Sequence, residues 1–128
     1  MEIEENRISK EILDACILIH RELGPGLLES VYEVLLEEEL VRRGFRVTRQ
    51  TEVPITWRGK RFIKGFEADL IINERVIIEL KSVEKLHPVH FKQTLTYLRL
   101  LNLRLGLLIN FGECYLKNGF HRVVNGLE

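Results

Sequence analysis

Apolar residues in the first third of the chain are three and four positions apart, the spacing that places them on one face of a helix. This pattern predicts a first helix from about Asn6 to Leu23, with an inner face made of Ile8, Ile12, Ala15, Cys16, Ile19 and Leu23. Gly24-Pro25-Gly26 ends it, because glycine suits a helix end and proline cannot continue a helix. A second helix is predicted from about Leu28 to Arg43, with apolar positions Val31, Tyr32, Leu35, Leu36 and Leu40.

From Phe45 onward the apolar residues follow the period of strands. Strands are predicted near residues 46–57, 61–72, 76–82 and 104–110. Arg58-Gly59-Lys60 forms the turn between the first two, and a helix runs from His87-Pro88 to about Leu101. After the last of these strands, the tail is expected to form a short strand or a loop. The element order ααβββαβ predicts one α/β domain over residues 1–128, a sandwich around a central mixed sheet.

Length and composition limit the class of protein. A chain of 128 residues can bury roughly two-thirds of its unfolded surface, and 45% hydrophobic with 30% charged residues is ordinary for a soluble globular protein. No apolar run approaches the ~20 residues of a membrane span, and the acidic start is not a signal peptide. Cys16 and Cys114 lack the spacing of metal ligands. These features predict a reduced, cytoplasmic protein that makes no membrane contact.

Charge is distributed unevenly although the net charge is zero. Residues 1–41 carry 11 acidic and 3 basic side chains, a net charge of −8. Residues 42–64 carry 8 basic side chains against Glu52 alone, a net charge of +7. A local basic block favours contact with a polyanion, and solvated edge strands are the alternative. The candidate nucleic-acid-binding residues are Arg42, Arg43, Arg46, Arg49, Arg58, Lys60, Arg61 and Lys64.

Two of the predicted strands carry charged residues among apolar ones. Asp69 precedes an apolar run, while Glu79 and Lys81 share one face at the end of the next strand, with Leu80 on the other face. A three-residue connection over 73–75 pairs Asp69 directly with Glu79, whereas a two-residue turn puts them on opposite faces. Two carboxylates about 4 Å apart repel by about 4 kcal/mol at an effective dielectric constant of about 20. Protonation or a bound cation relieves that repulsion.

Carboxylate oxygens beside a backbone carbonyl, here that of Leu80, suit a hard ion such as Mg²⁺, for which Mn²⁺ can substitute. Lys81 is placed to orient a water bound to such an ion. The alternative is an ordinary surface pair between Glu79 and Lys81, which contributes little to stability. This short pattern of common residues leaves both interpretations open.

Further polar residues are expected beside these strands. Gln93 and Tyr97 are four positions apart and share a helix face, where they can hold a phosphate or a water, or simply form a boundary tyrosine and a solvated glutamine. Glu29 opens the second helix, where it either caps the helix or directs a third carboxylate to the metal, with Tyr32 supporting it. His87 is expected to cap its helix, with His90 facing the phosphate.

Asp69, followed by Glu79-Leu80-Lys81 and then by Gln93-x-x-x-Tyr97, resembles the PD-(D/E)XK, or restriction-endonuclease-like, nuclease superfamily. The glutamine–tyrosine pair is similar to that of its recombination and repair exonuclease branch. Gly26-x-x-Glu29-x-x-Tyr32 is similar to the signature of the small GxxExxY proteins within it.

The resemblance covers nearly the whole chain and implies an α/β core with a mixed sheet. It implies Asp69 and Glu79 as metal ligands, Lys81 as the water-orienting residue and Glu29 as an accessory acid. Ala68 stands where the superfamily name has proline, a position without a chemical role.

These features together predict a Mg²⁺-dependent nuclease of low sequence specificity, acting on DNA rather than RNA. Two alternatives stay open: a nucleic-acid-binding module that keeps the nuclease fold without turnover, and a protein-interaction module such as a small homodimeric adaptor.

Overall fold

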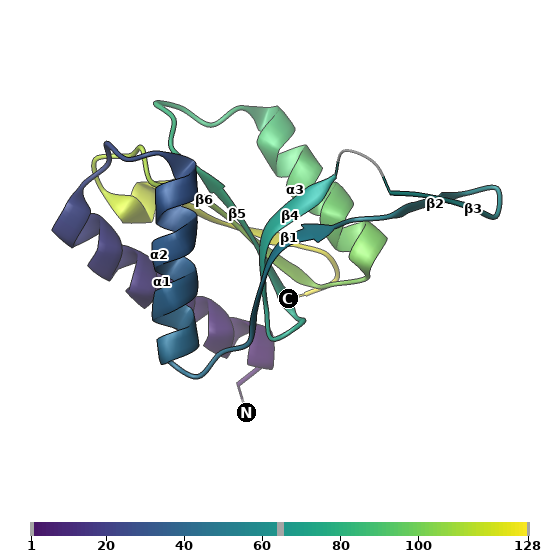
Figure 1. Cartoon of the computed structure of the whole chain (residues 1–128), viewed down its shortest axis with the longest axis horizontal. Helices are drawn as coiled ribbons and strands as arrows, with labels where there is room; N and C mark the ends of the chain where they lie inside the picture. Colours follow the sequence, from purple (N-terminus) through teal and green to yellow (C-terminus); the bar gives the residue numbers. More distant parts are fainter. Residues whose placement is uncertain (1, 64–65, 128) are drawn as a thin grey trace.

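The computed structural model describes residues 2–63 and 66–127 of the chain (Figure 1). The helices are α1 (Glu4–Leu23), α2 (Glu29–Arg42), α3 (Pro88–Leu101) and the short 3-10 helix η1 (Leu116–Gly119). The strands are β1 (Val47–Glu52), β2 (Ile55–Trp57), β3 (Lys60–Phe62), β4 (Glu67–Ile72), β5 (Val76–Lys81), β6 (Leu105–Asn110) and β7 (Phe120–Val124).

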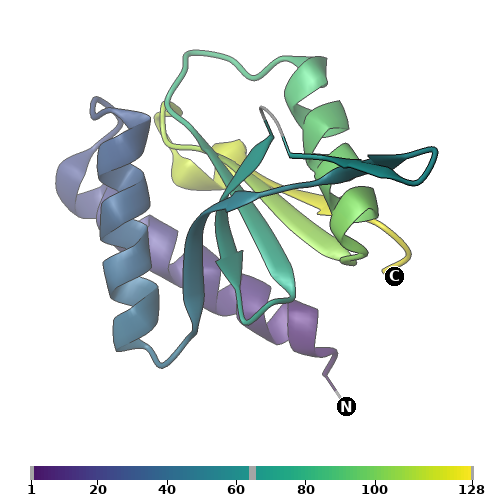
Figure 2. The same ribbon diagram turned by 45° about the vertical axis from the view of Figure 1, so that its right-hand side comes forward.

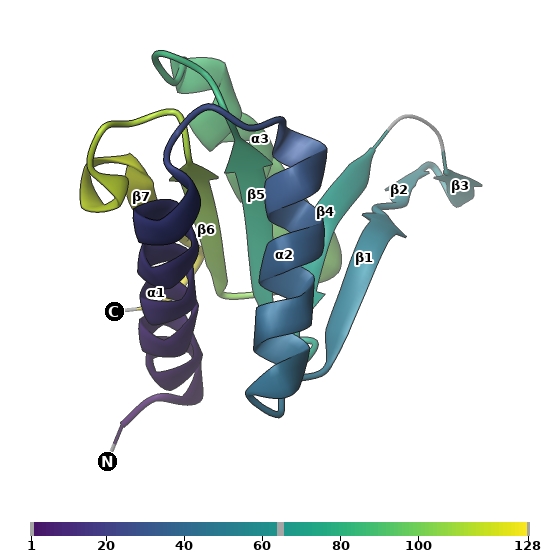
Figure 3. The ribbon, with the colours of Figure 1, turned by 60° about the vertical axis from the view of Figure 1, so that its left-hand side comes forward.

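Five of the strands form one mixed sheet in the order β1-β4-β5-β6-β7 (Figure 3). β5 and β6 are parallel, and the other neighbours are antiparallel. A parallel pair needs a crossover connection, and α3 supplies it between β5 and β6. As a result, the chain leaves β5 and β6 at the same edge of the sheet.

Helices cover both faces of this sheet, which confirms the predicted α/β/α sandwich. α1 and α2 lie on one face and α3 on the other (Figure 3). The first face packs Ile12 and Leu36 of these helices against Leu70 and Ile78 of the strands. The core on the second face includes Ile71, Ile77, Tyr97 and Leu98. β4 and β5 are apolar on both faces because both faces are covered.

The connection between β4 and β5 has the three residues predicted for it. Ile72 pairs with Val76, and Leu70 with Ile78. Asn73 and Glu74 form the turn at φ values of 51° and 57°, a left-handed conformation that asparagine adopts more readily than most residues. One residue beyond Leu70, the same register places Asp69 opposite Glu79. The expected pairing of these two acids therefore agrees with the register of the strands.

The predicted strands over 46–57 and 61–72 are each broken in two. Pro54 lies at the first break, where it has no N–H to donate to a ladder. In the described part of the chain, β2 and β3 pair only with each other, and they form a separate hairpin that projects from the sheet (Figure 2). Of the predicted turn Arg58-Gly59-Lys60, Arg58 and Gly59 form the turn, whereas Lys60 is the first residue of β3 and pairs with Trp57.

The tail, expected as a short strand or a loop, forms η1 and then β7, which pairs antiparallel with β6. Both cysteines are free, and burial of Cys16 raises the pKa of its thiol, as expected for a core residue. None of the helices within residues 2–63 and 66–127 is both long and apolar enough to cross a membrane.

Candidate active site

Two carboxylates, Asp69 and Glu79, link the start of β4 to the end of β5. The backbone N–H of Asp69 donates to Glu79 Oε2 at 2.8 Å, and the backbone N–H of Leu80 donates to Asp69 Oδ2 at 2.8 Å. Each side chain thus reaches across to the opposite strand just beyond the last backbone pair, Leu70 with Ile78. We call these two residues the carboxylate pair.

The carboxylate pair is poorly hydrated. Only 6% of Glu79 is exposed, and Asp69 is half-buried. Burial is the largest cause that raises the pKa of Glu79 to about 8, and the charge of Asp69 is the next. Burial likewise raises the pKa of Asp69 to about 6, against the hydrogen bond from Leu80, which lowers it. The site therefore favours either a proton or a cation beside these carboxylates.

A third acid, Glu33 of α2, is buried beside this pair and was missed by the sequence analysis. Its charge contributes to raising the pKa of Asp69 and of Glu79. Arg49 Nη2 donates to Glu33 Oε2 at 2.8 Å, and Gln50 Nε2 donates to Glu33 Oε1 at 2.7 Å. Gln50 holds a φ of 49°, which is unusual for a residue inside a strand. The available signal was its spacing of four from Glu29, which puts both acids on one helix face.

Glu29 lies where the sequence analysis expected it, in the first turn of α2, with an exposed side chain. A cavity of about 220 Å³ is lined by Glu29, Ser30, Glu33, Gln50, Asp69 and Leu80. Three acidic side chains from α2 and β4 therefore border one concave site. The shared lining is consistent with an accessory role for Glu29, which stays a prediction.

Tyr32 fixes the loop that leads into α2 rather than reaching the carboxylate pair. Its hydroxyl donates to the carbonyl of Gly24 and accepts from the N–H of Leu27 at 3.1 Å. Its ring stacks on Phe111 with the centroids 4.2 Å apart. Ser82 Oγ donates to the carbonyl of Leu27 at 2.6 Å, which ties the same loop to the end of β5. Tyr32 thus helps set the position from which Glu29 and Glu33 approach the strands.

Lys81 shares a strand face with Glu79 and is half-buried. Its charge opposes the rise in pKa of both carboxylates. Asn110 lies beside it on β6 and holds the segment that follows β5, because its side chain accepts from Val83 N at 3.0 Å and donates to Val83 O at 2.9 Å. Gly112 is required there, since a Cβ would lie 2.1 Å from the Val83 carbonyl oxygen. This clamp fixes the direction in which the strand carrying Lys81 ends.

Helix α3, on the face of the sheet opposite α1 and α2, carries Tyr97 and Gln93. Gln93 Nε2 donates to Tyr97 Oη at 3.0 Å, which confirms their shared helix face. Burial, followed by the charges of Glu79 and Asp69, raises the pKa of Tyr97. At the start of α3, the backbone N–H of His87 donates to His90 Nδ1 at 3.2 Å. Burial, followed by the charge of Lys81, lowers the pKa of His90.

The predicted basic residues divide into two groups. Arg43 forms ion pairs with Glu11, Asp14 and Glu39, and Arg49 pairs with Glu33 and Glu37. Within the described ranges, the other members have no ion pair, namely Arg42, Arg46, Arg58, Lys60 and Arg61. Lys64 lies outside the described residues. The charge count of the sequence therefore overstates the positive charge available to a phosphate.

The donor set fits a hard divalent cation only in part. Among residues 2–63 and 66–127, no group of three or more His, Cys, Asp or Glu side chains is arranged to hold a metal ion. The carboxylate pair offers two side chains, and the second oxygen of each accepts no hydrogen bond from the described residues. Mg²⁺ is commonly bound by one or two carboxylates together with waters and substrate phosphates. Asp69 and Glu79 supply two carboxylates of the kind that such a site uses.

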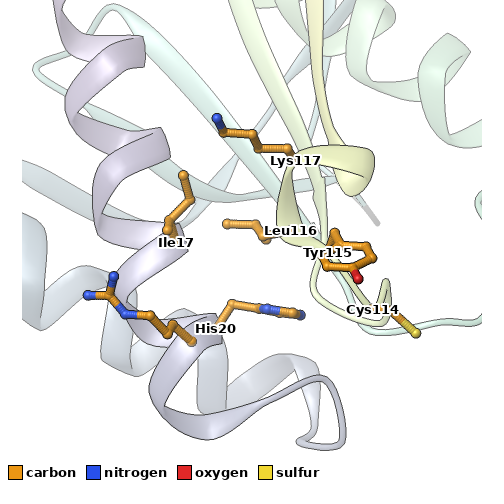
Figure 4. Close-up of a pocket in the computed structure, with 7 residues that line it drawn as sticks. Ile17, His20, Cys114, Tyr115, Leu116 and Lys117 are labelled. Atoms are coloured by element: carbon orange, nitrogen blue, oxygen red, sulfur yellow. The ribbon is translucent and has the colours of Figure 1, made fainter.

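A larger cavity, of about 340 Å³, lies between the end of α1 and the segment Cys114–Lys117 (Figure 4). Its lining includes His20, whose Nε2 is 2.8 Å from the carbonyl oxygen of Glu113. None of the predicted site residues lines it. The larger cavity is therefore separate from the acidic site.

The chain was compared with protein-family models, curated proteins and solved structures. A family model for the PD-(D/E)XK nuclease superfamily matches residues 6–123. No curated protein and no solved structure matches the chain. The matched range includes the carboxylate pair, Lys81 and α3.

Proposed function

The chain belongs to the PD-(D/E)XK nuclease superfamily, and we propose that it is a divalent-metal-dependent nuclease that hydrolyses phosphodiester bonds, in DNA rather than RNA. Membership of this superfamily itself suggests nuclease activity on nucleic acid. Within it, the motif Gly26-x-x-Glu29-x-x-Tyr32 supports a place among the GxxExxY proteins.

The observation that carries the proposal is the carboxylate pair. Two acids reach across the ends of adjacent strands, and burial with mutual repulsion disfavours their charged forms. In their charged forms these two acids lower the stability of the fold, because an uncompensated buried charge is costly. A divalent cation bound between them would compensate this negative charge, which explains why the two acids lie together.

Asp69, Glu79 and the Leu80 carbonyl would hold Mg²⁺ or Mn²⁺, which supplies Lewis-acid chemistry at the scissile phosphate when bound. Lys81 would position the attacking water and stabilise the negative charge that develops on the phosphoryl oxygens. Tyr97 and Gln93, already joined by a hydrogen bond, would orient a phosphate or water from the α3 side.

Two residues of α2 complete the proposed site. Glu33, fixed by Arg49 and Gln50, would set the electrostatic field beside Asp69 without touching the substrate. Glu29 is exposed, lines the cavity and would serve as the accessory acid.

Contacts to the nucleic-acid backbone would come from the basic residues that are not engaged in ion pairs. Arg58, Lys60 and Arg61 belong to the projecting hairpin, and Arg42 and Arg46 lie at the end of α2 and before β1. Because phosphate contacts carry no sequence information, we propose low sequence specificity.

The test is a cleavage assay on end-labelled single- and double-stranded DNA and RNA, with Mg²⁺ or Mn²⁺ and with a chelator. We expect cleavage of DNA only with the metal, and none by Glu79→Gln. Glu74→Gln is the matched control, because it makes the same chemical change at the opposite end of the same two strands. Binding without cleavage under either ion would favour a non-catalytic module, and loss of both would favour a protein-interaction module.

A further inference from the structure

The hairpin of β2 and β3 is separate from the sheet that supports the site. Figures 1 and 2 both show it projecting from the body of the molecule. Its pairs are Ile55 with Phe62, Thr56 with Arg61 and Trp57 with Lys60. An isolated two-stranded hairpin is only marginally stable in water, so a projecting one suggests a functional role.

One face of this hairpin is apolar and open to solvent. Because alternate residues of a strand share a face, Ile55, Trp57, Lys60 and Phe62 lie on the same side. Trp57 is 62% exposed and Phe62 is 49% exposed. Neither belongs to the two buried cores of the protein. Two aromatic rings are therefore presented outward at neighbouring positions.

The same hairpin is strongly basic. Arg58, Lys60 and Arg61 lie in or beside its turn, and no acidic residue occurs between Val53 and Phe66 in the sequence. The guanidinium of Arg58 lies over the Trp57 ring, 5.5 Å from its centroid. Exposed aromatic rings with interspersed basic side chains are what proteins use to bind single-stranded nucleic acid, with bases stacked on the rings and phosphates on the charges.

The base of the hairpin is attached next to the proposed active site. The N–H of Val53 donates to the carbonyl of Phe66 at 2.9 Å, which closes the two strands at their root. Phe66 packs edge-on against Tyr97 of α3, with the centroids 6.2 Å apart. Asp69 follows three residues later along the same chain segment. A strand lying on the hairpin can thus continue toward the carboxylate pair.

We propose that the apolar face of this hairpin is a stacking platform for unpaired nucleobases, with Trp57 and Phe62 as the rings that take them. The inference rests on the proposed nuclease function and narrows its substrate to single strands and to the unpaired parts of tailed or branched duplexes. The bases of a blunt duplex are stacked on each other and leave no free face for the rings.

Trp57 is the only tryptophan in the chain, so its fluorescence reports directly on this surface. The experiment titrates the whole protein, in chelator, with an oligothymidine of about 20 nucleotides and with a blunt GC-rich duplex of equal length, a length chosen to exceed the site size of a single-strand-binding fold. A base stacked on an indole quenches its emission. We expect strong quenching by the single strand and by a tailed duplex, and little by the blunt duplex.

Variants separate stacking from charge. Trp57→Ala should weaken binding of labelled oligothymidine about tenfold, as expected for loss of one stacked base, and Trp57→Phe should restore most of that loss. Tyr115→Ala is the matched control, because it removes another exposed aromatic ring, at a place outside the hairpin. It should bind like the wild type.

The two proposals fail in different ways. Metal-dependent cleavage without quenching of Trp57 would overturn the stacking platform and leave the nuclease standing. Quenching of Trp57 without cleavage would support the stacking platform and contradict the proposed nuclease activity. Equal quenching by the single strand and the blunt duplex would overturn the inference. So would a Trp57 emission that changes with protein concentration but not with added oligonucleotide, because this result would assign the face to contact with a second copy of the chain.

Discussion

The carboxylate pair and the β2–β3 hairpin represent two ways of placing charge. Glu79 is a buried acid and Asp69 a half-buried one, each held by a backbone N–H group at 2.8 Å, whereas Arg58, Lys60 and Arg61 are exposed bases on an isolated hairpin. The first arrangement is fixed before any ligand arrives, as chemistry requires. The second can adapt to a flexible strand. Under the proposed function, this fold would separate reaction from binding, on segments that meet at Phe66 and Tyr97.

The largest effect should come from Lys81→Ala. If Lys81 acts on the attacked phosphate, its loss should lower single-turnover cleavage by about 10²–10³-fold, the magnitude typical of one stabilising group in a transition state. Equilibrium binding should hardly change, because the hairpin is untouched. The cleavage rate and the binding affinity should be measured in parallel. An equal fall in both would contradict the separation of reaction from binding.

A smaller loss is expected for Glu33→Gln. Glutamine keeps the shape of the side chain but removes its ion pair with Arg49. Groups that orient or polarise a metal site without touching the metal typically change affinity or activity by about 10–100-fold. We expect a loss in that range in the cleavage rate, with an unchanged affinity for the oligonucleotide. The conservative variant Glu33→Asp should recover part of the rate, and a wild-type rate in Glu33→Gln would remove Glu33 from the account.

Charge reversal on the hairpin should act on binding alone. Arg58→Glu combined with Arg61→Glu removes two potential phosphate contacts, which should weaken binding about ten- to a hundredfold and lower the salt slope by about 2. The matched control is Arg43→Glu, because Arg43 already lies among three acids. It should leave the salt slope unchanged. An equal change of the salt slope in both variants would contradict phosphate binding by the hairpin.

The metal-free protein should lose stability as pH rises. The folded pKa of Glu79 is raised from 4.5 to about 8 and that of Asp69 from 3.8 to about 6, so the folded state keeps protons that the unfolded chain releases. The free energy of unfolding therefore falls between about pH 4 and pH 8. Denaturant unfolding of Glu79→Gln in chelator should show a weaker fall over that window. An identical pH profile for the two proteins would contradict the strained pair.

Glu29→Ala should have the smallest effect on the fold. Loss of an acid in a first helical turn typically costs about 0.3–1 kcal/mol of stability, and the side chain is exposed. Its melting temperature should stay close to that of the wild type while the cleavage rate falls. A large loss of stability without a change of rate would assign Glu29 to the helix alone.

The sequence was sufficient where local spacing determines geometry. Three residues between β4 and β5 put Asp69 and Glu79 face to face, and a spacing of four joined Gln93 to Tyr97. The same kind of spacing placed most of the apolar positions of the first two helices in the core, but Leu23 and Val31, which were also predicted to be apolar face positions, are exposed.

The remainder depends on contacts between distant segments. Glu33 was missed because helical spacing shows which acids share a face. It does not show which of them forms an ion pair with Arg49, sixteen residues further on. Arg43 was counted as available charge because two of its three partners, Glu11 and Asp14, come from another helix. The separate hairpin went unseen because alternation continues through Pro54, although the backbone pairing does not.

The central claim is that Asp69 and Glu79 form a divalent-metal site, and thermal unfolding with and without Mg²⁺ or Mn²⁺ tests it most directly. A ligand at a hundred times its dissociation constant stabilises the fold by about 2.7 kcal/mol. We predict a clear metal-induced rise in melting temperature for the wild type and for Glu74→Gln, and none for Asp69→Asn or Glu79→Gln. Equal rises in all four proteins, or no rise in any of them, would contradict the account.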